Sequence, residues 1–547
     1  MRWMPQFTDQ SMEMEGFFWR DGFNDLLLAT DARAVCIGSG RFLRAVLVPV
    51  LQRLNCEVVL LQPRGTDFAE TCRKDCFNSY DIETIHPNGR IQAEFVQLKA
   101  VGSLARQNDR QAFLRLPSRL HDLRFIGLGV TEAGLQPGSA VVAHLAEFLV
   151  ECWRTIPGNR LSVLNTDNVP SNGDLTKTLV LQAAAQLLPN EMGSFTDYLE
   201  TSVRFHNTMV DRLTSHAPES IFTPRGEPWP SKTMVIEDCD GFLEDEDFSV
   251  FESHVHIRKQ RLEFLRDHQL KLRLANATSS ALASVMALSR FKTNNEARNV
   301  PVVLAFRDKL VELDILPALV SDGVPQADVE GTYAEWSDRS SHPCFGLDNL
   351  WVTQDALLRF KARLFSTIRS HVSRDAHHRP SIFMAFVLAS ICRFLVPRAP
   401  VDASTDPPTS VLMGAMDHNS DKTKENEDHG EWEYGGGLRA NLPEGTYEFK
   451  DGADGRVARA LHEAYDRISP DSAPPQLTPS ATTIQAVETA LQAIEGDVDR
   501  LRQQWLSLDA FVADVALLFE RLVVAHKRRV PMAALSVLTD LVEPPRG

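Results

Sequence analysis

Two glycines stand where the backbone could approach a phosphate. The segment IGSGRFLRA places Gly38 and Gly40 directly after an apolar run, at the point where a helix should begin. Bare backbone, free N–H groups and the positive end of a helix dipole together suit a pyrophosphate. Leu43 replaces the third glycine of the usual G-x-G-x-x-G pattern. From spacing alone, a dinucleotide site and an ordinary tight turn are about equally good interpretations.

The next apolar run, EVVLLQPRG, ends without the carboxylate that usually holds an adenosine ribose. Gln62 and Arg64 stand there instead. An arginine at this place could accept a ribose phosphate, which would favour NADP. A solvated turn arginine explains the same residue equally well.

A third group of candidates is Lys271, Asn276 and Ser279 in KLRLANATSSAL, which has helical periodicity. Lys271 and Asn276 are five residues apart, about 500° around an α-helix, so they should project about 140° apart. Only a helix end or a cleft could use both. Without other information, a solvated lysine and a polar helix residue explain the pair better.

Other polar clusters predict no metal site. Cys72 and Cys76 lack a second pair for zinc, and the segment 417–428 has Lys422 where a calcium loop needs glycine. The acid run EDEDF (244–248) is expected to be a solvated loop or a helix start.

The elements that must hold these residues suggest two domains. Within residues 1–232, short apolar runs alternate with helical segments, which predicts a parallel, doubly wound α/β sheet. Residues 233–547 have mostly helical periodicity, and SIFMAFVLASICRFLV, apolar nearly all round, predicts one buried helix. Proline, glycine and charge are dense at about 398–482, which indicates a flexible insertion.

Composition limits the classes of partner. The 547 residues contain 57 Lys and Arg against 73 Asp and Glu, a net charge of −16, and such a field repels nucleic acid and anionic membranes. No segment approaches the ~18 apolar residues of a membrane helix, and the N-terminus lacks a signal-peptide pattern. Eight cysteines are too few for a disulfide scaffold. We therefore expect a cytoplasmic protein.

Six motifs, in order, resemble the polyol-specific long-chain dehydrogenases, a family that includes mannitol 2-dehydrogenase and the tagaturonate and fructuronate reductases. The resemblance extends from about residue 34 to about 397. The motifs are IGSGRFLRA, VTEAGL (130–135), NTDNVPSNGD (165–174), FHNTMVDRLT (205–214), VIED (235–238) and KLRLANATSSAL (271–282).

The resemblance implies a Rossmann-type N-terminal domain that binds NAD or NADP and a mostly α-helical C-terminal domain for substrate and catalysis. By analogy, Lys271 is a general base, Asn276 and Asn168 bind the developing oxyanion, and Ser279 stands where the family has a histidine. The expected cofactor-binding residues are Gly38, Gly40, Phe42, Gln62, Arg64, Thr131, Glu132 and Asp211. The expected substrate-binding residues are Arg339, His342 and Arg359, with Lys361 as an alternative to Arg359.

The implied activity is a zinc-independent, NAD(P)-dependent interconversion of a secondary alcohol and a ketone on an open-chain polyol or sugar acid. Mannitol with fructose, or a hexuronate, are the named candidates. Serine at the histidine position and the insertion also allow an alternative function. In that case the chain would be a catalytically impaired family member that acts as a cofactor-binding or regulatory protein. The sequence leaves the oligomeric state open between monomer and homodimer.

Overall fold

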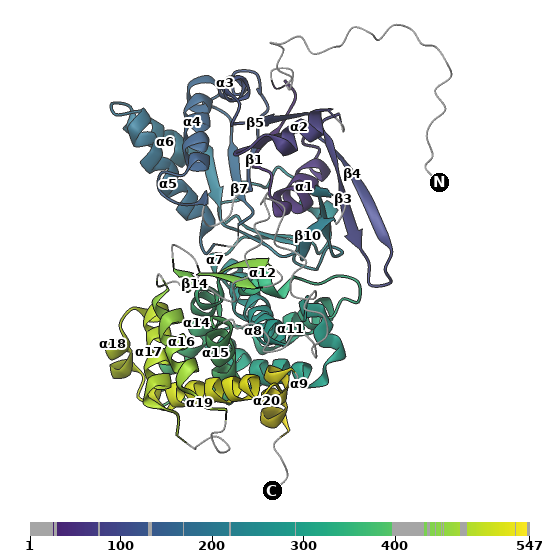
Figure 1. The fold of residues 1–547 in the computed structure, drawn as a ribbon. Helices are drawn as coiled ribbons and strands as arrows, with labels where there is room; N and C mark the ends of the chain where they lie inside the picture. The colour runs from purple at the N-terminus through teal and green to yellow at the C-terminus, as the bar shows by residue number, and fades with distance from the viewer. Residues whose placement is uncertain are drawn as a thin grey trace. The chain divides into compact units, whose positions relative to one another are not determined.

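A computed structural model describes most of the chain, which divides into two compact units. Unit 1 comprises the described residues of Met1–Thr84, Ala93–Arg225 and Trp229–Gln260, and unit 2 those of Ile85–Gln92, Gly226–Pro228 and Arg261–Gly547 (Figure 1). The described residues are 26, 30–74, 77–129, 134–167, 169–217, 220–289, 291–396, 432–434, 438–442, 445–449, 451, 453, 455–470, 478–530 and 532–543.

Unit 1 is built on a parallel six-stranded sheet with the order β5-β2-β1-β6-β7-β8. This order confirms the predicted doubly wound fold, because the chain winds outward in both directions from β1. Its strands are β1 (Ala34–Gly38), β2 (Val58–Gln62), β5 (Ala100–Ser103), β6 (Phe125–Gly129), β7 (Leu161–Asn165) and β8 (Val203–His206).

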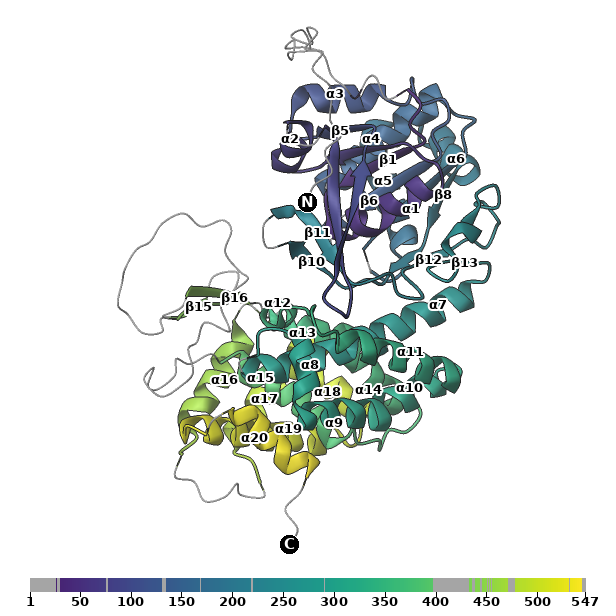
Figure 2. The ribbon, with the colours of Figure 1, turned by 90° about the vertical axis from the view of Figure 1, so that its right-hand side faces the viewer.

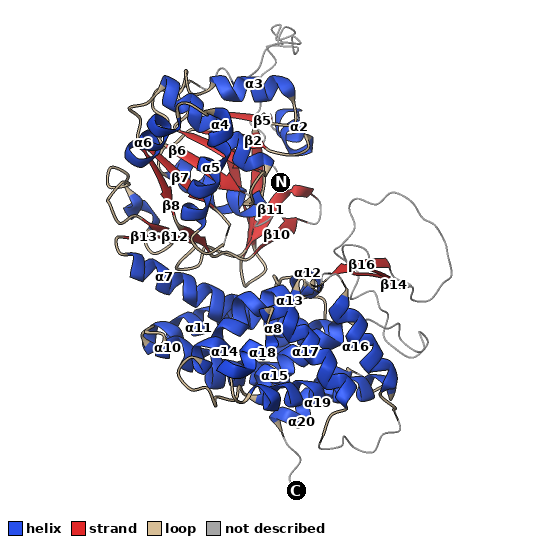
Figure 3. Ribbon diagram, turned by 90° about the vertical axis from the view of Figure 1, so that its left-hand side faces the viewer, coloured by secondary structure: helices blue, strands red, loops and turns tan. Residues whose placement is uncertain are grey.

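Helices cover both faces of this sheet, so its strands are apolar without alternation. Val35 and Ile37 pack in a core with α3 (Gln107–Arg115), α4 (Ala140–Thr155), α5 (Asn172–Leu187) and α6 (Met192–Ser202). Ala34 and Cys36 face the opposite core, with α1 (Val48–Arg53) and α2 (Asp67–Lys74). Figure 3 shows α4, α5 and α6 over one face of the strands.

Two smaller sheets complete the strands of unit 1. One has the order β10-β11-β3-β4 and the other β13-β12-β9. Because β12 pairs with β9, and β13 in turn pairs with β12, unit 1 extends to Gln260, whereas the sequence suggested a division at 232/233. The strands are β3 (Ser79–Ile85), β4 (Ile91–Gln97), β9 (Thr208–Val210), β10 (Thr214–Ala217), β11 (Ser220–Gly226), β12 (Met234–Glu237) and β13 (Val255–Arg258).

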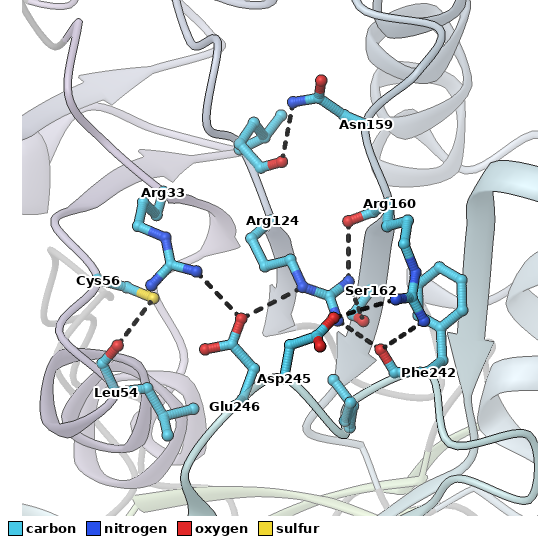
Figure 4. A network of polar contacts seen from close by, with 12 residues as sticks. Arg33, Leu54, Cys56, Arg124, Asn159, Arg160, Ser162, Phe242, Asp245 and Glu246 are labelled. Carbon is cyan, nitrogen blue, oxygen red and sulfur yellow. Dashed lines mark hydrogen bonds and ion pairs between the residues drawn. The ribbon is translucent and has the colours of Figure 1, made fainter.

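A polar network connects the amino-terminal ends of three strands of the six-stranded sheet, β1, β6 and β7 (Figure 4). Arg33 and Arg124 directly precede β1 and β6, and both donate to the Glu246 carboxylate, at 3.0 and 3.2 Å. Arg160, before β7, pairs with Asp245 at 3.0 Å. The expectation of a solvated acid run at 244–248 is therefore wrong for Glu246, whose side chain is 7% exposed. The run instead binds the arginines at the strand starts.

Unit 2 is mostly helical, as predicted, and its core surrounds α15 (Ile382–Phe394) (Figure 2). Residues on all sides of α15 are buried, which confirms the predicted buried helix. The other helices are α7 (Arg261–Gln269), α8 (Ala277–Leu288), α9 (Pro301–Leu310), α10 (Leu316–Ser321), α11 (Gln326–Ser340), α12 (Asn349–Thr353), α13 (Ala356–Arg359), α14 (Phe365–Val372), α16 (Arg456–Arg467), α17 (Ala481–Glu495), α18 (Val498–Gln504), α19 (Leu508–Lys527) and α20 (Ala533–Val542).

Much of the predicted insertion at 398–482 lies outside the described residues. Its described parts include α16, which packs in the helical core, and a small sheet of β14 (Trp432–Tyr434), β15 (Leu438–Leu442) and β16 (Gly445–Phe449). Within the described ranges, no helix combines the length and apolar character needed to cross a bilayer.

Among the described residues, four helices contain a π-helical turn, in which one residue more than usual separates the hydrogen-bonded groups. Such turns are rare, and they recur at functional sites. They are η2 (Leu43–Leu47), η5 (Leu270–Asn276), η7 (Val311–Ile315) and η8 (Phe360–Leu364).

Candidate active site

The glycine turn after β1 has the conformation that the sequence suggested. Gly38 has φ +141°, and a Cβ on it would lie 2.4 Å from the Gly129 carbonyl oxygen, so the protein itself requires glycine here. A Cβ on Gly40 would meet nothing closer than 3.5 Å. Gly40 is exposed and protein packing does not require it, so its missing side chain suits the approach of a ligand.

Leu43 fills the place of the missing third glycine because Gly129 makes room for it. A Cβ on Gly129 would lie 2.5 Å from the Leu43 Cβ, closer than real carbon contacts allow. The usual third glycine permits close packing of helix against strand. Here Gly129 on β6 provides the space instead, so helix and strand still pack closely although Leu43 replaces the third glycine.

Arg44 holds the glycine turn from within the protein. It is 3% exposed, its Nε donates to the Ser39 carbonyl at 2.7 Å, and its guanidinium also donates to the Phe222 carbonyl. Burial lowers the pKa of Arg44 to about 10, so it stays charged at neutral pH. Phe42, partly buried, packs against the core beside it. A rigid glycine turn, a helix N-terminus and a buried positive charge fit a pyrophosphate.

At the end of β2 the two predicted residues differ in availability. Gln62 is buried, and its side-chain amide donates to the Arg64 carbonyl at 2.8 Å and accepts from the Ala69 N–H at 3.1 Å. Gln62 therefore shapes the loop. Arg64 is exposed, and its guanidinium makes no hydrogen bond or ion pair with any described residue. Of the two, Arg64 is the one that could contact a ribose phosphate.

Three of the recognised motifs meet in one hydrogen-bond network at the carboxyl end of β7. The fully buried Asn172 donates to the Thr208 carbonyl at 3.0 Å and accepts from the Thr208 N–H at 2.9 Å. Asn207 caps α5, because its Oδ1 accepts from the Gly173 N–H at 2.9 Å, and its Nδ2 donates to Glu237 at 2.6 Å. Asn172, Asn207 and Glu237, one from each of these three motifs, thus have structural roles.

Several predicted residues of unit 1 lie outside this network. Asn168, Thr131 and Glu132 lie outside the described residues. Asp211 directly follows β9 and is half-buried, and its N–H donates to the Thr233 carbonyl at 2.9 Å. Asn165, at the end of β7, is 1% exposed and its Nδ2 has no partner in the described chain. This orphaned donor is a further candidate that the sequence reasoning did not single out.

The predicted catalytic pair lies on the π-helical turn η5. The N–H of Ala277 bonds to the Leu272 carbonyl, five residues back. In such a turn residues five apart lie nearly above one another, so Lys271 and Asn276 share a side of the helix. The 140° separation expected for an α-helix is therefore wrong here. Both residues are half-buried.

Ser279 lies in the first turn of α8 and is 8% exposed. Its hydroxyl donates to the Ala275 carbonyl at 2.8 Å, one helical turn back. The remaining lone pairs can accept a hydrogen bond, but the hydroxyl cannot take the charge that a histidine can.

Arg363, which the sequence did not single out, ties a second π-helical turn to the first. It lies on η8, and its Nη1 donates to the Ser280 hydroxyl at 2.7 Å and to the Asn276 carbonyl at 3.4 Å. Four residues earlier, the Arg359 guanidinium stacks on the Trp351 ring at 5.2 Å and makes no hydrogen bond or ion pair with the described residues. Burial lowers the pKa of Arg359, although nearby Asp355 opposes this. Lys361 is exposed.

The other two predicted substrate residues are occupied by protein partners. Arg339 makes a buried ion pair with Glu227, with an Nη2 to Oε1 distance of 2.7 Å and side chains that are 14% and 2% exposed. His342 accepts from the Cys344 N–H at its Nδ1, so its Nε2 donates to the Ile85 carbonyl at 3.0 Å. These contacts favour structural roles for both. No group of three or more metal-binding side chains occurs among the described residues.

Comparison with known proteins agrees with the resemblance found in the motifs. Residues 32–255 match the family model described as the mannitol dehydrogenase Rossmann domain. An altronate oxidoreductase of Klebsiella pneumoniae (strain 342) is 22% identical over 392 residues, covering 66% of this chain and 79% of the relative. One from Enterobacter sp. (strain 638) is 23% identical over 399 residues, with the same coverages.

Two solved structures share the fold. Mannitol 2-dehydrogenase of Pseudomonas fluorescens, in a ternary complex with NAD and D-mannitol, aligns with a TM-score of 0.62 at 17% identity and covers 95% of this chain and 96% of that one. A substrate-free D-sorbitol dehydrogenase aligns at 0.55 with 19% identity, over 68% and 82% of the two chains. The predicted resemblance and fold class are confirmed.

Proposed function

With residues 32–255 matching the mannitol dehydrogenase Rossmann domain as the premise, we propose that this chain is an NAD(P)-dependent oxidoreductase acting on an open-chain polyol or sugar acid. The reaction interconverts a secondary alcohol and a ketone. The observation on which the catalytic assignment rests is the π-helical turn η5, because it brings Lys271 and Asn276 to one side of a helix. The relatives support this substrate class, because one is named for altronate, a sugar acid, and another for mannitol, a polyol.

The cofactor would bind at the glycine turn of unit 1. Gly38 and Gly40 would let the backbone approach the pyrophosphate, and Arg44 would keep the turn rigid and positively charged. When bound, the nicotinamide supplies or accepts the hydride. Arg64 leaves both NAD and NADP open, since its guanidinium could pair with a 2′-phosphate or remain in solvent.

Lys271 would move the proton. In the oxidative direction its amine takes the hydroxyl proton as hydride leaves the same carbon, and in the reductive direction the ammonium returns it. Asn276 would donate a hydrogen bond to the developing oxyanion, a contribution worth roughly 3 kcal/mol, and Asn168 would add a second donor. A lysine in this role replaces the Lewis acid of zinc enzymes, so the proposed reaction is zinc-independent.

Arg359 favours a sugar acid over a neutral polyol. Its guanidinium is half-buried, lies over Trp351 and is free to pair with a carboxylate. It is connected to the catalytic turn through its own helix, because Arg363, one turn further on, donates to the Asn276 carbonyl. A hexuronate or its reduced form would carry the carboxylate that Arg359 requires. Mannitol with fructose is the second candidate.

The test is Lys271→Ala. We expect the variant to bind NADH within about twofold of the wild type and to lose at least about 100-fold in kcat on the best substrate from a panel of hexuronates, aldonates and polyols. Lys309→Ala, which changes an exposed lysine of α9 that pairs with Glu312, is the matched control and should keep full turnover. Unchanged turnover in Lys271→Ala would refute the assignment.

The panel also separates the alternative function. The Ser279 hydroxyl is already bonded to its own helix, which favours a chain that binds cofactor without turnover. NADH binding by the wild type with no reaction across the panel would support that regulatory role. Arg359→Met should raise the KM for a hexuronate at least about tenfold and leave that for mannitol unchanged, if the sugar acid is the substrate.

A further inference from the structure

Unit 2 contains a cavity that the proposed reaction does not use. It has a volume of about 820 Å³, and its lining residues come from α14, the turn that follows α14, the end of α17, and α18 with the residue after it. This volume is in the range of small-molecule sites. All of its lining residues belong to unit 2 and to the described part of the chain.

The cavity has an apolar floor and a basic rim. The floor includes the buried side chains of Phe365, Ile368 and Trp505. Arginines 369, 374 and 500 line it as well, although the whole chain has a net charge of −16. Arginine forks match carboxylate and phosphate oxygens, and aromatic faces accept a flat or apolar body. This combination suits a small organic anion.

The two acids that line the cavity are partly neutralised by the protein. Glu495 forms an ion pair with Arg369, and Asp497 accepts from the Arg500 N–H as the N-cap of α18. The Arg500 guanidinium itself makes no hydrogen bond or ion pair with the described residues. Arg369 and Arg374 have carboxylate partners, so the Arg500 guanidinium is the cation of the cavity lining that is available to a ligand.

A short relay connects this cavity to the turn that contains Lys271. The Nη2 of Arg374 donates to Asp322 Oδ1, and the other oxygen of Asp322 accepts from Arg273 Nη1. Arg273 is 7% exposed and belongs to η5, two residues after Lys271. Its Nε and Nη2 have no partner in the described chain, so Asp322 is the anchor of this guanidinium among the described residues. An anion that draws on Arg374 would therefore change how Asp322 is shared between Arg374 and Arg273, and so change its hold on the turn.

We propose that this cavity is an effector site for a small organic anion with an apolar body, and that Asp322 transmits its occupancy to the Lys271 turn. The regulatory half of this proposal rests on the proposed function, because it assigns Lys271 to catalysis. The binding half does not. A phosphate ester and a carboxylate share the chemistry that the arginines recognise, and the experiment distinguishes them.

Binding is tested by calorimetry on the full chain with phenyl phosphate, benzoate and phenol. We expect at least one of the two anions to bind with Kd below about 1 mM, and phenol not to bind. Arg500→Gln should weaken that binding at least about tenfold, because it removes the available charge. Arg502→Gln is the matched control, since Arg502 pairs with Glu488, Asp499 and Asp509 outside the cavity. Absence of anion binding, or equal binding by Arg500→Gln, would overturn the site.

Transmission is tested by hydrogen exchange of the peptide that covers η5. The anion should change exchange at 270–276 in the wild type, and Asp322→Asn should abolish that change while keeping the affinity for the anion. Circular dichroism checks that Asp322→Asn is folded, and Arg374→Lys serves as a second variant of the relay. An unchanged exchange pattern in the wild type would overturn the relay. Neither measurement requires turnover, so failure of the proposed function is detected separately.

Discussion

The fit between Leu43 and Gly129 predicts a strong and specific coupling at the glycine turn. In Gly129→Ala the new Cβ would lie 2.5 Å from the Leu43 Cβ and 2.9 Å from its Cδ2, roughly 1 Å inside ordinary carbon contact. The Cβ cannot rotate away, so helix and strand must separate. We expect a loss of about 3 kcal/mol in unfolding free energy, the upper end for overpacked cores, and at least about tenfold weaker NADH binding.

Partial truncation of Leu43 should relieve less of the clash than complete removal. Leu43→Ala removes the Cδ2 contact at 2.9 Å but keeps the Cβ contact at 2.5 Å, so it should relieve only part of the cost of Gly129→Ala. Leu43→Gly costs several kcal/mol by itself, because a buried leucine is lost and glycine is placed in a helix. Combined with Gly129→Ala, however, it should be about 1–3 kcal/mol more stable than the sum of the single effects.

Urea unfolding followed by fluorescence measures these stabilities, and fluorescence titration measures NADH affinity. Additive effects in the Leu43→Gly and Gly129→Ala pair would refute the reasoning. So would equal relief by Leu43→Ala, since the contact between the two Cβ positions would then not be the cause.

Four further predictions follow from single contacts. Gly40→Ala should keep the melting temperature of the wild type but weaken NADH binding about tenfold, because only a ligand needs that space; equal affinity would remove Gly40 from the site. Arg64→Gln should weaken NADPH binding about 10- to 100-fold and leave NADH binding unchanged, and an unchanged NADPH affinity in the same titration would show that this arginine stays in solvent. Burial lowers the pKa of His206, so the unfolded chain binds its proton first as the pH falls. Stability should therefore drop below about pH 6.5 by up to about 1.4 kcal/mol per pH unit from this group, a slope that His206→Gln should reduce in urea titrations. Glu246→Gln should cost about 3–5 kcal/mol in the same assay, because the buried guanidinium of Arg124 then keeps its charge without its carboxylate partner; a loss under 1 kcal/mol would contradict this account.

Local patterns were sufficient to predict the fold. The strand before Gly38, the turn and the following helix could be recognised because their signals, an apolar run, two glycines and a helical period, lie within one short segment of the sequence. The same holds for α15, whose apolar character all round matches the burial of its residues 383–393. Parallel order followed from the alternation of strands and helices.

The site could be predicted only in part, because its key contacts are not local. A single extra residue in the turn of η5 leaves no mark on helical periodicity, so the relation of Lys271 to Asn276 was predicted wrongly. Glu227, the partner of Arg339, lies 112 residues away in the chain. The arginines that bind Glu246 are also remote in sequence, at separations of 213 and 122 residues, so the sequence predicted a solvated acid run. Pairing across such separations is decided by tertiary packing.

The network of Asn172, Asn207 and Glu237 has a consequence for how the chain folds during its synthesis. The cap of α5 depends on Asn207, and Asn207 is itself held by a carboxylate that follows it by 30 residues. A nascent chain that has just completed the six-stranded sheet would still lack that anchor and the pairing of β12 with β9. Release of Glu237 from the ribosomal tunnel should thus be the event that locks the first unit, and a fragment ending at residue 232 should be proteolysed faster than one ending at 260.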